Sequence, residues 1–140
     1  MKGVEVTSVV LCDEVRREVA GSAIIIGAKP SGPPVADDKI THLLRLALYI
    51  ELEVPFPAPK KVAFRLRDTK MDYNVLEHSF ELPEMDDSEE TEGDFDLRGV
   101  VVCVLNEDNV EIRGSGILEV QIKYDRSKWS KVREFVFPTV

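Results

Sequence analysis

The segment from Ile40 to Val54 constrains the fold more than any other part of the chain. Its even-numbered positions are large and apolar at seven of eight sites, and the exception is His42. Its odd-numbered positions are mixed and include Arg45, Glu51 and Glu53. Side chains alternate between the two faces of a β-strand, so this pattern predicts one long strand with a buried face and a wet face. A helix would place the glutamates among the leucines, because no helical stripe separates the two sets.

The alternation also predicts which side chains of this strand are inside. The residues expected to be buried are Leu44, Leu46, Leu48 and Ile50. Arg45 and Glu51, on the opposite parity, should stay largely exposed. The segment is longer than most strands, so we expect a β-bulge within it.

Shorter apolar runs, separated by glycine, proline and asparagine, recur along the rest of the chain. They predict further strands in the ranges 4–12, 22–27, 62–66, 76–82, 100–105, 118–124 and 129–137. About eight or nine strands in 140 residues are typical of one all-β domain, residues 1–140. An antiparallel β-sandwich fits this pattern best, and a β-barrel is the alternative.

Three segments carry more specific expectations. Val100 to Leu105 is apolar on both parities, which predicts a central strand covered on both faces. Asn106 to Asn109 is expected to form a turn after it. Asp13 to Val19 is the stretch that suggests a helical turn.

The negative charge of the chain is concentrated in one place. The formal charge is -8, and residues Glu84 to Asp96 hold eight acids and no base. Removing those eight from the 26 acids leaves 18, which balances the 18 lysines and arginines. Like charges repel one another and resist packing, so an acidic mobile loop is expected at about 84–96.

Cysteine usage and the chain start indicate a cytoplasmic protein. Cys12 and Cys103 both lie in apolar runs, and two cysteines in a chain of this length do not make a disulfide framework. We therefore predict buried free thiols in a reducing compartment. The start of the sequence does not resemble a signal peptide, and no apolar run is long enough for a membrane helix.

The first half of the chain resembles a family of small, mostly β bacterial proteins. The likeness rests on Leu11 to Gly21, which reads Leu-Cys-Asp-Glu-Val-Arg-Arg-Glu-Val-Ala-Gly, and on Ile24-Ile25-Ile26-Gly27. It extends to the proline-interrupted segment Pro55 to Pro59 before the next strand. The resemblance implies a small, largely β domain, and the family has no known activity to transfer.

Asp13, Glu14 and Arg16 form a candidate polar site between two apolar strands. In the functional interpretation, Arg16 binds a carboxylate at one end of the sandwich. The favoured interpretation is a salt-bridge network that orders the turn, because exposed pairs of this kind are common and weak.

The remaining candidate chemistry is weaker. Zinc would need about four ligands, and His42, His78, Cys12 and Cys103 come from separate strands without paired spacing. Each histidine is therefore expected to be hydrogen-bonded near a strand end. Ser115 lies between two glycines but lacks the pattern of a nucleophile elbow. No catalytic residue is assigned, and no cofactor is expected.

Two charged segments offer binding alternatives. Calcium binds six to eight oxygen ligands, and some β-sandwiches hold it between loops at one end. The candidate ligands in the acidic loop are Asp86, Asp87, Asp94 and Asp96. Bases near Tyr124 and Trp129 could bind single-stranded nucleic acid, and a polar strand face is the favoured interpretation. Those bases are Lys123, Arg126, Lys128, Lys131 and Arg133.

The sequence thus favours a binding or assembly module that acts through protein–protein contacts, or through self-association, and not by catalysis. One alternative is a calcium- or small-ligand-binding sandwich that uses the acidic loop. A second is an enzyme whose site is assembled from distant residues. Neither a membrane nor nucleic acid is an expected partner.

A thermal melt separates the mobile-loop interpretation from calcium binding. We expect the same midpoint in millimolar Ca²⁺ and in chelator, and a similar midpoint when Glu84 to Gly93 is replaced by a short Gly/Ser linker. Bound calcium would instead stabilise the fold by about 2.7 kcal/mol at a hundredfold excess over its dissociation constant. A calcium-dependent rise that is lost when the four aspartates become asparagine would make this loop the functional site.

Overall fold

A computed structural model describes residues 3–18, 22–28, 40–56, 58–82, 98–113 and 117–137. The described residues form nine strands and no helix, so none of them forms a helix that could cross a membrane. The strands are β1 (Glu5–Cys12), β2 (Glu14–Arg17), β3 (Ala23–Ile26), β4 (Ile40–Pro55), β5 (Lys61–Asp68), β6 (Tyr73–Glu81), β7 (Arg98–Arg113), β8 (Ile117–Tyr124) and β9 (Ser130–Val136).

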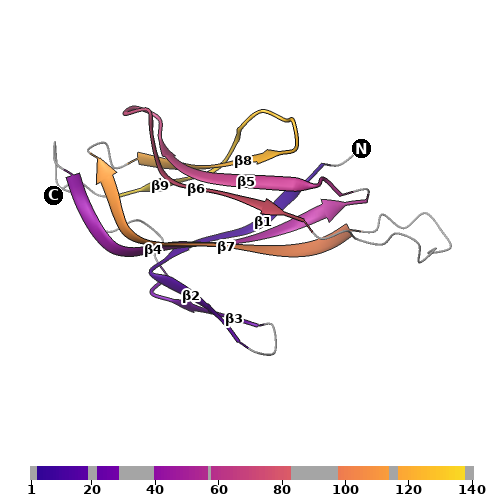
Figure 1. Ribbon diagram of the computed structural model, residues 1–140, viewed down its shortest axis with the longest axis horizontal. Helices are drawn as coiled ribbons and strands as arrows, with labels where there is room; N and C mark the ends of the chain where they lie inside the picture. The colour runs from indigo at the N-terminus through magenta and orange to yellow at the C-terminus, as the bar shows by residue number, and fades with distance from the viewer. Residues whose placement is uncertain are drawn as a thin grey trace.

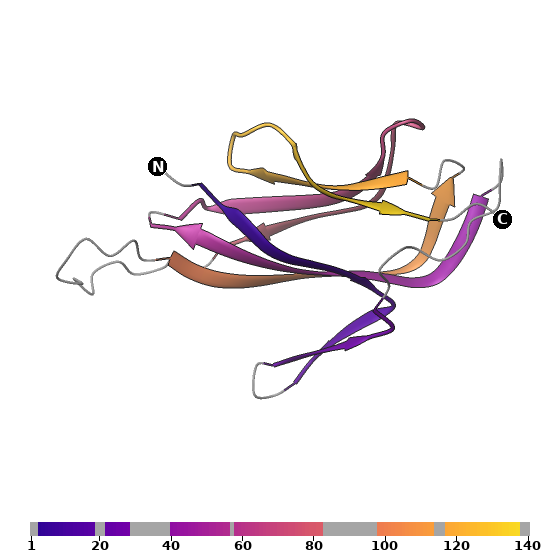
Figure 2. The same cartoon turned by 180° about the vertical axis from the view of Figure 1, so that it is seen from behind.

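Two antiparallel sheets face each other, and a hairpin projects from one of them (Figure 1). The first sheet has the order β1-β4-β7, and the second has the order β6-β5-β8-β9. The hairpin β2–β3 extends from the outer face of the three-stranded sheet, as both ribbon views show (Figures 1 and 2). The predicted all-β sandwich is confirmed, and the described strands do not close into the alternative barrel.

The main core lies between the two sheets. From β4 it takes alternate residues that are fully buried, Leu46, Leu48, Ile50, Leu52 and Val54. The opposite sheet contributes a matching set, Val62, Phe64, Leu66, Leu118 and Val120. These residues alternate along their strands with polar or half-buried ones, except at Ala47, which is buried on the other face of β4. Each sheet therefore presents an apolar face to the other.

The burial predicted for the long strand is correct from Leu46 onward and wrong at Leu44. Leu44 is 83% exposed, whereas its neighbour Leu43 packs against the core. The expected bulge does not occur here, because β4 and β7 keep one register on both sides of this point. The ladder of β4 with β1 has a register shift, between Val6 and Ser8 of β1. The paired ends of β4 and β7 curl instead towards the second sheet (Figure 1), and Asn109 of β7 has a φ of 55°. The bend reverses which parity faces the core. Of the two residues expected outside, Arg45 is exposed and Glu51 is half-buried.

The expectations for the segment after Arg98 need two corrections. β7 lies at the edge of its sheet, because it pairs with β4 and the four-stranded sheet is separate. Its second apolar face is partly covered by the hairpin, since Val104 packs against the cluster around Val15, but Val100 is 66% exposed. No turn forms at Asn106–Asn109, because the strand continues through it to Arg113.

The helical turn expected at Asp13–Val19 is also wrong. Residues Glu14–Arg17 form β2, which pairs in register with β3. Val15 is buried on the side that faces the sheet, while Arg16 points to solvent, so the segment follows the alternation of a strand. The β-branched partner strand, Ala23–Ile26, favours this pairing.

Both cysteines are buried free thiols, as predicted. Cys12 belongs to the small cluster under the hairpin, and Cys103 belongs to the main core. The two thiols therefore lie on opposite faces of one sheet. Burial raises the pKa of the Cys103 thiol to about 11.

The bend in β4 predicts opposite results for two neighbouring leucines. Leu46→Ala removes a fully buried side chain and should lower the free energy of unfolding by about 2–5 kcal/mol. Leu44→Ala, its matched control, should change it by less than about 0.5 kcal/mol, because Leu44 faces solvent. Urea unfolding measures both values. Comparable losses in the two variants would contradict the bend.

Candidate binding surfaces

One side-chain amide of the three-stranded sheet forms hydrogen bonds with the backbone of the hairpin β2–β3. Asn106 of β7 accepts a hydrogen bond from the Val15 amide at Oδ1 (3.2 Å) and donates one from Nδ2 to the Val15 carbonyl (3.3 Å). The amide thus pairs with β2 as a neighbouring strand would. Beneath this contact, Val15 packs with Cys12 and Ala47 in a separate apolar cluster.

The candidate polar site lies at this junction. Glu14 forms an ion pair with Arg16 at 3.4 Å and accepts a hydrogen bond from Arg45 of β4 at 3.2 Å. Arg45 also lies 3.8 Å from Asp108. The side chains of Arg16 and Arg45 are 63% and 58% exposed, so the pairs contribute little to stability. Sequence reasoning missed Arg45 and Asp108, because each reaches the junction from a distant strand.

Asp13 lies at the base of the hairpin. Its amide donates to the Ile26 carbonyl at 3.0 Å, and its side chain lies against Gly27. Gly27 has a φ of 68°, and a Cβ there would come within 2.1 Å of an Asp13 carboxylate oxygen. The close approach of Asp13 to the backbone therefore requires glycine at this position.

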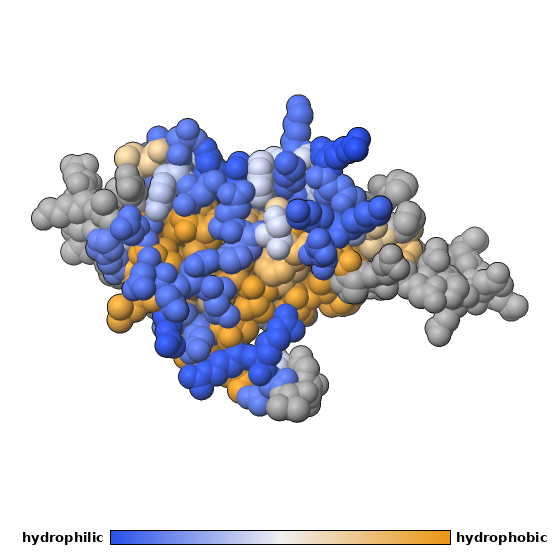
Figure 3. Space-filling view, in the orientation of Figure 1, coloured by the Kyte–Doolittle hydropathy of each residue, from blue (hydrophilic) through white to orange (hydrophobic). Residues whose placement is uncertain are grey.

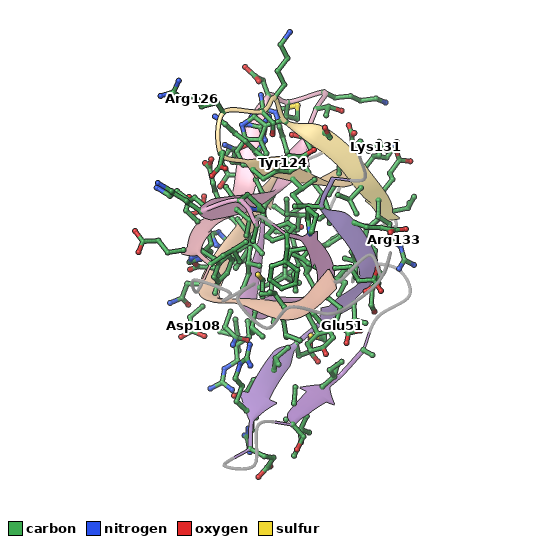
Figure 4. All side chains as sticks on the ribbon, turned by 90° about the vertical axis from the view of Figure 1, so that its right-hand side faces the viewer. Glu51, Asp108, Tyr124, Arg126, Lys131 and Arg133 are labelled. Atoms are coloured by element: carbon green, nitrogen blue, oxygen red, sulfur yellow. The ribbon has the colours of Figure 1, made fainter. Side chains whose placement is uncertain are left out.

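Both edges of the three-stranded sheet are contacted by an arginine. Arg133 of β9 donates to the Val9 carbonyl of β1 at 3.0 Å, and Arg17 of the hairpin donates to the Val102 carbonyl of β7 at 3.1 Å. In the view along the sandwich, Arg133 lies on one side and Asp108 of β7 on the other (Figure 4). Charged side chains at sheet edges hinder the addition of a further strand.

Apolar surface adjoins the β7 edge. Val100 is 66% exposed, and Ile24 and Ile26 of the hairpin are 45% and 37% exposed. In the space-filling view, apolar atoms form a band between the polar face of the four-stranded sheet and the hairpin (Figure 3). Of these three side chains, Val100 lies on β7 itself, whereas Ile24 and Ile26 lie opposite Arg16 and Glu14 on the hairpin face that is turned away from the sheet. A large exposed apolar side chain on an edge strand favours contact with a partner.

The histidines and cysteines do not form a common site. His78 of β6 pairs with Glu107 of β7 and so joins the edges of the two sheets, whereas His42 is exposed and lies 3.9 Å from Glu111. No group of three or more potential metal ligands occurs within the described ranges. The calcium candidates Asp86, Asp87, Asp94 and Asp96, and Ser115, lie outside the described residues.

The bases near the C-terminus contact different partners. Lys131 pairs with Glu134 at 3.1 Å, which raises the pKa of Lys131, and Arg133 is engaged at the β1 edge. Lys123 lies 6.0 Å from the centre of the Trp129 ring, over which Arg65 of β5 is stacked at 4.1 Å. Arg65 was not among the residues predicted from the sequence, because the ladder between β5 and β8 brings it to Trp129.

Comparisons of the chain with protein-family models, with curated proteins and with solved structures found no match. The resemblance to small bacterial β proteins therefore stays a prediction.

The Asn106 amide should control how firmly the hairpin is held. Asn106→Ala leaves the amide and carbonyl of Val15 without these partners, which should cost about 1–3 kcal/mol. Amide hydrogen exchange should accelerate at Val15 and stay unchanged at Leu48 in the main core. Asp108→Ala is the control, since it removes only a long, exposed ion pair. Unchanged protection of Val15 in Asn106→Ala would contradict this role.

Proposed function

We propose that this protein is a non-catalytic binding or assembly module that acts through protein–protein contacts at the β7 edge. The observation that carries the proposal is the position of β7, a 16-residue strand at the edge of its sheet with Val100 exposed near its start. Long apolar edge strands are templates for the addition of another strand.

Backbone groups that point away from β4 supply the hydrogen bonds for such a partner. The Thr7 hydroxyl donates to the Glu51 carbonyl on the β1 side, at 3.3 Å. Glu51 therefore directs its backbone groups towards β1, and its cross-strand partner Val102 directs its own groups outward. The same alternation turns Val100 and Val104 outward. Arg17 contacts one of these carbonyls and must leave before a strand can pair there.

A second copy of the chain is the partner that the residue pattern favours. In an antiparallel pair of β7 strands centred on Cys103, Val102 of one copy would lie opposite Val104 of the other. Both residues direct their backbone N–H and C=O groups outward, so the two edges would match. The same register sets Val101 opposite Leu105. Apolar pairs across neighbouring strands stabilise a sheet.

We also propose a cytoplasmic location. Two buried thiols that remain free suit a reducing compartment. The location and the partner are independent parts of the proposal, since strand addition requires neither thiol.

Sedimentation velocity over a range of concentrations tests the assembly. Val100→Lys should weaken self-association, because the lysine charge would be brought into the new interface. Arg17→Ala should strengthen it by roughly thirtyfold, because the symmetric pair requires two Val102 carbonyls to be freed and each saves about 1 kcal/mol.

Val136→Lys is the matched control, because Val136 is 52% exposed but lies on β9, in the other sheet. It should leave the association constant unchanged. A protein that stays monomeric at every concentration in both the wild-type and Arg17→Ala forms would contradict assembly through β7.

A further inference from the structure

The outer face of the four-stranded sheet contains a small pocket that the β7 edge does not use. Its centre is Ala63 of β5, which pairs with Ser79 of β6 on one side and with Lys123 of β8 on the other. A methyl group between longer neighbours leaves a hollow of about 250 Å³. Its remaining walls are Lys61, Glu77, Asp125 and Trp129.

The two carboxylates at the pocket are already engaged. One oxygen of Asp125 accepts from the backbone amides of Lys60 and Lys61, at 3.0 Å and 3.1 Å. Glu77 accepts from the Asn74 side chain at 3.2 Å. These bonds hold the carboxylates towards the strand ends and turns.

Hydrogen-bond donors remain at the same place. Within the described part of the chain, the ammonium groups of Lys61 and Lys123 form no ion pair, and the Ser79 hydroxyl forms no hydrogen bond. Three donors that line one hollow, two of them charged, suit an anionic group, because charge-assisted hydrogen bonds are the strong ones.

Trp129 adds a rigid apolar wall. The Arg65 guanidinium stacks on its ring at 4.1 Å and is fixed in turn by a 2.6 Å hydrogen bond from Nε to Gln121. A ring held in this way can pack against a second planar group without losing much side-chain freedom.

We propose that this pocket binds a small organic anion that carries a planar ring, with the anionic group between Lys61 and Lys123 and the ring against Trp129. The hollow is smaller than most ligand pockets, which span roughly 300–1,000 Å³, so a single ring with one anionic group is the class of ligand that fits. This site goes beyond the proposed strand addition, because it lies on the other sheet.

Titrations followed by ¹H–¹⁵N NMR test the site with three probes of similar shape. Benzoate and phenyl phosphate carry a carboxylate and a phosphate, and benzyl alcohol is neutral. Both anions should give saturable shifts at the Trp129 indole and at the amides of Ser79 and Lys123, and the tighter of the two identifies the anionic group. Benzyl alcohol should bind at least tenfold more weakly. Equal binding of the neutral probe, or no saturable shift with either anion, would overturn the proposal.

Two kinds of variant separate the pocket from its surroundings. Lys61→Met with Lys123→Met should weaken anion binding at least tenfold and leave the neutral probe unaffected. Ala63→Leu should abolish binding by filling the hollow, and its amide spectrum verifies that it is folded. Lys131→Met is the control, because Lys131 lies outside the pocket and pairs with Glu134. Loss of binding in this control equal to that in the double variant would also overturn the proposal.

Discussion

The packing of β4 against the four-stranded sheet is the interaction on which the rest of the structure depends. Its inward residues from Leu46 to Val54 are fully buried, and both neighbours, β1 and β7, are held in place by pairing with it. Its opposite face bears Ala47, which is buried under the hairpin. A single strand therefore positions the core, the two sheet edges and the junction of the hairpin.

A sandwich of two open sheets has edges that must be protected, and the two edges of the three-stranded sheet are protected differently. The β1 edge is contacted by Arg133, which belongs to the opposite sheet and is therefore part of the sandwich itself. The β7 edge is contacted by Arg17, which belongs to the projecting hairpin. Movement of the hairpin would carry Arg17 away from β7, whereas Arg133 extends from a strand that is packed into the sandwich.

Much of the fold could be predicted from the sequence, because alternation is a local signal. Leu46, Leu48 and Ile50 are buried as their parity indicates. The failures have non-local causes. Leu44 turns outward because β4 and β7 bend together, and β2 is a strand because it pairs with β3 and packs on the sheet. The candidate surfaces were harder to predict. Glu14 and Arg16 are close in sequence, but Arg45 reaches Glu14 because the hairpin packs on the three-stranded sheet, and Arg65 reaches Trp129 because β5 pairs with β8.

Because the two thiols lie on opposite faces of one sheet, their labelling rates report two different motions of the protein. Cys12 is enclosed by the hairpin, and Cys103 by the second sheet. Cys103 is buried in the main core and burial raises its pKa to about 11, so its alkylation reports opening of that core. Alkylation of Cys12 requires only that the hairpin lift. The labelling rates of the two sulfurs thus measure two separate opening events within one molecule.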